Sequence, residues 1–115
     1  MAPLIDKIKN LFSDKRNNDE FPTTVESAVD QLLSELSDFN RNRISHMDED
    51  RLRVFHQNFQ FNISNKFRLW NNVPLKQSCC ELEGVSRVST DQASYIILME
   101  LQNRIRQVEY KEFKI

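Results

Sequence analysis

Glycine, proline and cysteine are scarce in this chain of 115 residues, which contains one glycine, three prolines and two cysteines. Tight β-hairpins favour Asn-Gly or Asp-Gly turns, and neither pair occurs in the sequence. A phosphate-binding loop of the usual kind needs several glycines close together, so that class of site is excluded as well. The shortage of turn residues therefore favours helices over a sheet built from hairpins.

The two cysteines, Cys79 and Cys80, are neighbours in the sequence. A disulfide between adjacent residues would strain the backbone without closing a useful loop. We therefore expect two reduced and partly buried thiols. The spacing between His46, His56 and the cysteines does not match a zinc site, so we expect no metal.

Long hydrophobic runs are also missing. The longest, Tyr95 to Met99, ends at Glu100 and is far shorter than the roughly 20 apolar residues of a membrane-spanning helix. The amino terminus reaches a charge at Asp6 and lacks the apolar region of a secretory signal. We therefore expect a cytoplasmic protein without a membrane span.

Neither sign of charge is in excess, since 16 basic residues face 17 acidic ones and the net charge is −1. Proteins that bind nucleic acid through its phosphates carry several uncompensated basic side chains. Here the basic residues are interspersed with acidic ones, as where Arg51 and Arg53 follow three acidic residues. No nucleic-acid partner is expected, and a nucleic-acid-associated regulator is the weakest of the functions considered.

The sequence does contain enough apolar material for one folded core, since 39% of the residues are hydrophobic and eight are phenylalanine. Apolar positions three and four apart predict an all-α fold, a compact bundle of about four to six helices with a tethered N-terminal amphipathic helix. The expected parts are the N-terminal helix (1–12), a polar linker (13–20), the helical domain (21–108) and a C-terminal tail (109–115).

Within the helical domain, local signals predict where helices begin and end. Thr23 with Glu26 forms a capping box before a helix that runs to Leu36, and Ser89 with Gln92 forms another before the last helix. Between them we expect a short helix carrying Phe39 and Ile44, a long helix from about Asp48 to Phe67, a short helix opened by Pro74, and a loop over 81–88. The last helix has the longest apolar stripe, from Ala93 to Val108, and should be the central element.

Apolar residues on two faces of the long helix predict contacts on two sides. Its main stripe consists of Leu52, Phe55, Phe59 and Ile63. Val54 and Phe61 lie off that stripe, so we expect them to contact a second neighbour.

The order of several short motifs resembles a small uncharacterised family of bacterial helical domains, a domain of unknown function. The motifs lie between Phe21 and Arg104 and read Phe21-Pro22, then Leu52 with His56 after Phe55, then Ile63-Ser64-Asn65-Lys66-Phe67-Arg68-Leu69-Trp70, and finally Asp91-Gln92-Ala93-Ser94. The resemblance implies a small helical protein and brings no activity, cofactor or catalytic residue. Two departures, at 58–61 and in a longer loop over 80–88, could alter any groove that the family uses.

His56 is the main candidate for a polar site. A catalytic histidine needs a reacting group within hydrogen-bond reach and a partner that orients the ring, and the sequence indicates neither. We therefore interpret His56 as a buried structural histidine and expect no catalytic residue. Glu26 and Glu100, each beside an apolar stripe, are interpreted as boundary residues.

Trp70 is the most informative residue for a binding function. It either closes a corner between two helices or anchors a partner, since tryptophan and arginine are enriched in binding hot spots. Arg68, Lys66 and Asn65 would then form a polar rim. The apolar stripe of the N-terminal helix, with Leu4, Ile8 and Phe12, is the second candidate surface, for the core, a second copy, a partner's groove or, more weakly, a membrane surface.

The sequence thus favours a non-catalytic interaction or accessory module that binds a protein partner or associates with itself, without a cofactor. The alternative from another class is a small enzyme or metal-binding protein centred on His56.

Overall fold

A computed structural model describes residues 21–113, with side chains through residue 108. The predicted N-terminal helix and the linker lie outside the described residues. Within them the chain is all-α, without a strand, as predicted. The elements are α2 (Val25–Glu35), α3 (Asp38–Ser45), α4 (Glu49–Phe67), the 3₁₀ turn η1 (Leu69–Asn71), α5 (Val73–Glu83) and α6 (Thr90–Phe113).

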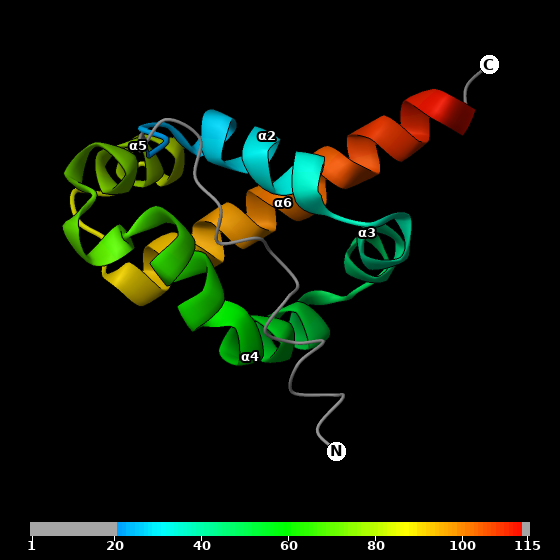
Figure 1. The fold of residues 1–115 in the computed structure, drawn as a ribbon, viewed down its shortest axis with the longest axis horizontal. Helices are drawn as coiled ribbons and strands as arrows, with labels where there is room; N and C mark the ends of the chain where they lie inside the picture. The colour runs from blue at the N-terminus through cyan, green and yellow to red at the C-terminus, as the bar shows by residue number, and fades with distance from the viewer. Residues whose placement is uncertain (1–20, 114–115) are drawn as a thin grey trace.

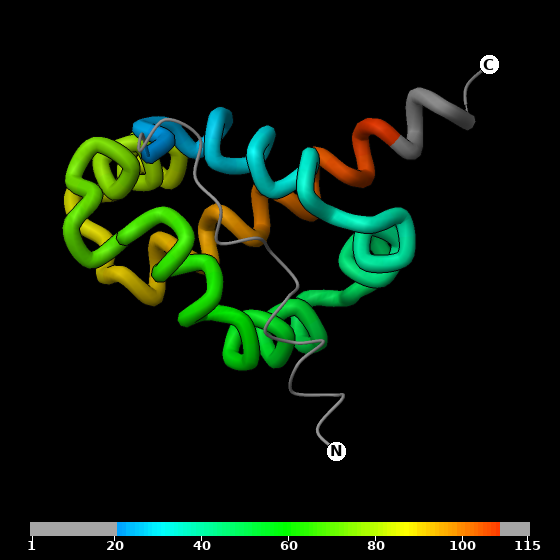
Figure 2. Tube along the Cα trace, in the orientation of Figure 1, coloured from blue at the N-terminus to red at the C-terminus, as the bar shows by residue number. Residues whose placement is uncertain are grey.

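Helix α6 is the central element, as its long apolar stripe predicts. It crosses the middle of the molecule, with α2 on one side, α4 on the other, and α3 and α5 towards its two ends (Figures 1 and 2). Four residues of α6 are completely buried: Ala93, Ile97, Leu98 and Leu101. Together they span a wide arc around the helix axis. A helix surrounded by neighbours buries more than one stripe. Val108, by contrast, is 39% exposed and lies beyond the core.

The capping signals are confirmed at α6 and displaced by one residue at α2. The Ser89 hydroxyl accepts from Gln92 N at 3.1 Å, and the Gln92 side chain accepts from Ser89 N at 2.8 Å. At α2 the cap is Thr24, whose Oγ1 accepts from Ser27 N at 3.1 Å, and not Thr23. Two adjacent threonines offer the same chemistry, so the sequence alone did not distinguish them.

Two helices extend further than their sequence signals indicate. Helix α5 continues to Glu83, so the loop expected over 81–88 begins only at Gly84, whose φ of 68° ends the helix. Helix α6 continues to Phe113 and so includes most of the residues expected as a C-terminal tail.

The main stripe of α4 is buried as expected, but its second set of apolar residues is not. Val54 is 57% exposed and Phe61 is 70% exposed, so the expected contact on a second side is wrong for the described part of the chain. On α3, Ile44 is buried while Phe39 is 70% exposed. The molecule therefore presents apolar side chains on the outer faces of α3 and α4.

None of the described helices is long and apolar enough to cross a membrane.

Candidate functional site

The corner between α4 and α5 exposes the only tryptophan of the chain. Helix α4 ends at Arg68, which adopts a left-handed conformation with φ 50° and ψ 52°. This region is unfavourable for residues with a β-carbon, by about 1 kcal/mol or more. Trp70 follows on η1 and is 56% exposed. This exposure is greater than expected of an aromatic side chain that closes a corner between two helices.

Buried neighbours on either side of Trp70 hold this corner in place. Leu69 is completely buried. The Asn72 side chain donates to the Phe67 carbonyl at 3.0 Å and to the Pro22 carbonyl at 3.1 Å, and accepts from Leu75 N at 3.2 Å. Since each buried polar atom of Asn72 has a partner, the turn is well defined and the indole is presented outwards.

The residues predicted to surround Trp70 divide into two groups. Asn65 and Arg68 are exposed, and the Arg68 guanidinium lies 5.3 Å from the centre of the Phe21 ring. Lys66 is buried instead, and its Nζ lies 2.7 Å from both carboxylate oxygens of Glu35. Lys66 therefore belongs to the interior and not to a polar rim. Leu4, Ile8 and Phe12, the second predicted surface, lie outside the described residues.

His56 is buried between α4 and α6, as expected of a structural histidine. Its Nε2 lies 2.6 Å from the hydroxyl of Ser94. The Ser94 hydroxyl also lies 2.9 Å from the Asp91 carbonyl, to which it can donate. Ser94 is completely buried, so this pair ties the two helices together inside the core.

The environment of His56 favours its neutral form. Burial lowers the pKa of His56, and the negative charge of Asp91 opposes this only in part. The ring also packs edge-on against Tyr95, with the ring centres 5.1 Å apart. These contacts, like the hydrogen bond to Ser94, are those of a packed core residue.

The other polar candidates do not form a reactive cluster. Glu26 and Glu100 line one hollow of about 550 Å³ together with Glu81 and Arg104. His46 lies at the end of α3, exposed, with Nδ1 2.8 Å from the Asn42 carbonyl. Among the residues with described side chains, no group of three or more His, Cys, Asp or Glu is placed to hold a metal ion.

Both cysteines are free and buried, as expected. Burial raises the pKa of Cys79 to about 11, and the nearby Cys80 and Glu83 act in the same direction. Cys79 is therefore a protonated core thiol and not a nucleophile.

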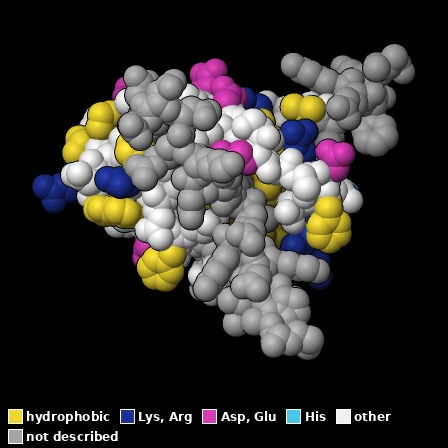
Figure 3. All heavy atoms as spheres, in the orientation of Figure 1, with side chains coloured by type: hydrophobic (Ala, Val, Ile, Leu, Met, Phe, Trp, Pro, Cys, Tyr) yellow, Lys and Arg dark blue, Asp and Glu magenta, His cyan; other side chains and the backbone are white. Residues whose placement is uncertain are grey.

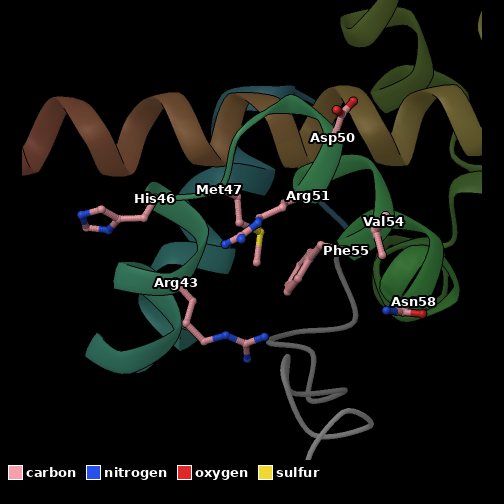
Figure 4. Close-up of a pocket in the computed structure, with 8 residues that line it drawn as sticks. All are labelled: Arg43, His46, Met47, Asp50, Arg51, Val54, Phe55 and Asn58. Carbon is pink, nitrogen blue, oxygen red and sulfur yellow. The ribbon is translucent and has the colours of Figure 1, made fainter.

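A hollow of about 580 Å³ between α3 and α4 was not anticipated (Figure 4). Met47, Val54 and Phe55 supply its apolar wall, and Figure 4 shows the Arg43 and Arg51 side chains reaching over the same space. Its wall includes Val54, which was expected to pack against a neighbour. The only signal in the sequence is the placement of Val54 outside the main stripe of α4.

Polar side chains of α6 fix the α3–α4 turn that forms one wall of this hollow. The Gln102 amide donates to the carbonyl oxygens of Ile44 and Met47, both at 2.8 Å. Arg106 donates to the Ser45 carbonyl at 2.8 Å and to that of Met47 at 3.0 Å. These bonds supply donors to carbonyls at the end of α3 and in the turn that follows it, of which the Ile44 carbonyl also accepts from Met47 N.

A family model described as "Domain of unknown function (DUF6794)" matches residues 21–105, most of the chain. The chain belongs to the DUF6794 family. The match begins at Phe21, where the described structure also begins, and ends at Ile105, the last buried apolar residue of α6. The family domain thus coincides with the helical core described above. No curated protein and no solved structure matches the chain.

Proposed function

We propose that this DUF6794 protein is a non-catalytic interaction module that binds a protein partner through its α4–α5 corner. The contact surface consists of Trp70 at its centre, Val73 beside it, and the polar side chains of Asn65 and Arg68. The observation that carries the proposal is the exposure of Trp70, 56% of which is accessible to solvent.

An exposed tryptophan on a fixed turn has the properties of a binding anchor. Its indole provides a large contact area with few rotatable bonds, so little entropy is lost on binding. Val73, three residues further on, is 71% exposed and enlarges the apolar area. Hydrophobic side chains emerge at the side of the molecule where η1 lies, next to basic ones (Figure 3).

The conformation of Arg68 supports the same assignment. A left-handed residue with a β-carbon is strained, and strain of this kind is concentrated at functional sites. Glycine would relieve it, yet the chain uses an arginine whose guanidinium stacks on Phe21. The strained turn is therefore associated with an exposed cation directly beside the exposed tryptophan.

The geometry around His56 favours a non-catalytic function over an enzyme centred on this residue. His56 is hydrogen-bonded to a serine that is completely buried, so a substrate would have to open the core to reach the pair. Two free, buried thiols are compatible with a reducing compartment. We accordingly propose a cytoplasmic location, in a bacterial cell as the resemblance noted from the sequence implies.

The test compares three full-length chains as affinity baits in lysate of the source organism: wild type, Trp70→Ala and Leu82→Ala. Leu82 is 48% exposed on α5 and serves as the matched control. A partner bound through the corner is recovered by the wild type and the control and is lost with Trp70→Ala. The affinity of the purified partner should fall by about thirtyfold or more, as for a hot-spot residue.

Equal affinity of that partner for the wild type and Trp70→Ala would contradict the proposal. Sedimentation of the isolated chain tests self-association separately. A dimer that dissociates on Trp70→Ala would make the partner a second copy. Turnover of a substrate that is abolished by His56→Ala but not by Trp70→Ala would favour the enzyme alternative.

A further inference from the structure

The α3–α4 hollow combines an apolar wall with two cations that have no carboxylate partner among the described residues. Arg43 comes from α3 and Arg51 from α4, and in Figure 4 Arg51 lies across Met47 while Arg43 extends beneath Met47 and Phe55. Neither guanidinium forms an ion pair with another residue of the described chain. Asp50 also lines the hollow, but its carboxylate lies 3.7 Å from Arg53 and, as Figure 4 shows, points away from the other side chains.

Other arginines of this domain have clear structural partners. Arg53 and Arg104 pair with carboxylates, while Arg41 and Arg106 donate to backbone carbonyls. Arg43 instead lies 5.7 Å from the centre of the exposed Phe39 ring. The two arginines at the hollow are thus available to an anion from outside, and Phe39 extends the apolar surface next to one of them.

The size of the hollow fits a small organic ligand. Ligand sites usually enclose about 300–1,000 Å³, with mostly apolar walls and a few polar groups that orient the ligand. The α3–α4 hollow, at about 580 Å³, lies within this range. Guanidinium groups bind carboxylates through charge-assisted and often bidentate hydrogen bonds.

We propose that the α3–α4 hollow binds a small amphipathic carboxylate, with its apolar body against Met47, Val54 and Phe55 and its carboxylate on Arg43 and Arg51. A purely apolar ligand would leave both cations unused, and a purely polar anion would leave the apolar wall exposed. This site shares no residue with the Trp70 surface, so the two proposals stand or fall separately.

The test is titration of the full chain with octanoate, followed by calorimetry and by backbone amide shifts. Octan-1-ol, which has the chain without the charge, and acetate, which has the charge without the chain, are the matched ligands. Octanoate should bind more tightly than either and shift amides of residues 43–58. Arg43→Gln and Arg51→Gln should each lower the affinity for octanoate by about tenfold and leave the affinity for octan-1-ol unchanged.

Two further variants complete the design. Val54→Asp places a like charge in the hollow and should abolish octanoate binding, while the 57% exposure of Val54 means that the fold is retained, which far-UV circular dichroism checks. Arg87→Gln removes an exposed arginine of the α5–α6 connection and should change nothing.

Octanoate affinity that is equal in wild type, Arg43→Gln and Arg51→Gln would overturn the proposal, as would failure of octanoate to bind at all. Hydrogen exchange on the same samples tests another occupant. Protection of backbone amides 3–12 that is lost in Val54→Asp would assign the hollow to the amphipathic N-terminal segment of this chain and would also overturn the proposal.

Discussion

Lys66 and Glu35 form an ion pair between α4 and α2, with both carboxylate oxygens 2.7 Å from the ammonium nitrogen. The Lys66 side chain is completely buried, whereas that of Glu35 retains 19% exposure. Removal of the carboxylate should therefore destabilise the fold more than removal of the ammonium, because a fully buried charge that loses its counterion has no water to solvate it.

Removal of one partner of this pair should therefore be asymmetric in its effect. Glu35→Gln removes the carboxylate that the buried ammonium contacts and should lower the free energy of unfolding by about 3 kcal/mol or more. Lys66→Met leaves only a partly exposed carboxylate and should cost less. Urea unfolding of both variants gives the comparison, and a larger loss for Lys66→Met would contradict it.

The His56–Ser94 contact predicts a stability that falls as the pH is lowered. Burial lowers the pKa of His56 below its value of about 6.5 in the unfolded chain, so the unfolded state binds the proton more readily. The contribution of His56 is complete above about pH 6.5 and is lost as the pH falls towards its lowered pKa. Between pH 7.5 and pH 5.0 the free energy of unfolding should therefore fall more in the wild type than in His56→Asn.

The matched control for this experiment is His46→Asn, since His46 is exposed at the end of α3. If His46→Asn removed the difference between the two pH values and His56→Asn did not, the assignment to His56 would be wrong.

Gln102 connects α6 to the end of α3 and predicts a specific loss of stability. Gln102→Ala removes two hydrogen bonds to the carbonyls of Ile44 and Met47. The Ile44 carbonyl keeps the Met47 N–H as a donor and the Met47 carbonyl keeps Arg106, so the loss is that of two hydrogen bonds and should be about 1 to 2 kcal/mol. Thermal unfolding measures the effect, and Gln107→Ala, at an exposed position of the same helix, should be close to neutral. Equal effects of the two substitutions would contradict the prediction.

The only glycine of the chain occupies a position where its conformational freedom matters. Gly84 ends α5 with φ at 68°, and a β-carbon built there has no atom within 4 Å. Gly84→Ala should therefore cost about 1 kcal/mol through backbone strain alone. Gly84→Asn should cost less, because asparagine tolerates this region better. A loss well above 2 kcal/mol for alanine would indicate a steric clash that this geometry excludes.

The success of the helix predictions has a local cause. Capping boxes, apolar positions three and four apart, and a glycine at a helix end all act within one or two turns of the chain. The Ser89–Gln92 cap and the buried stripe of α4 were therefore predictable from the sequence. The cap of α2 was displaced by one residue because Thr23 and Thr24 compete for the same role, and only the observed hydrogen bond distinguishes them.

The candidate sites were less predictable because they depend on contacts between distant segments. Ser94 follows His56 by 38 residues and Glu35 precedes Lys66 by 31, so neither partner could be identified from spacing. For Trp70 the sequence left two roles open, and only the structure shows that its neighbours Leu69 and Asn72 fill the interior while Trp70 is exposed. The α3–α4 hollow requires the relative placement of two helices, which no local pattern specifies.

By itself the sequence determined that this protein is helical, where its helices begin to within about a residue, and which stripe of each helix is apolar, since these properties arise from interactions between near neighbours in the chain. Only the tertiary structure decided that Lys66 is buried, that Trp70 is exposed, and that Arg43 and Arg51 share one hollow. The physical reason is that burial and pairing depend on which helix faces which, and that choice is made by the packing of the whole core around α6.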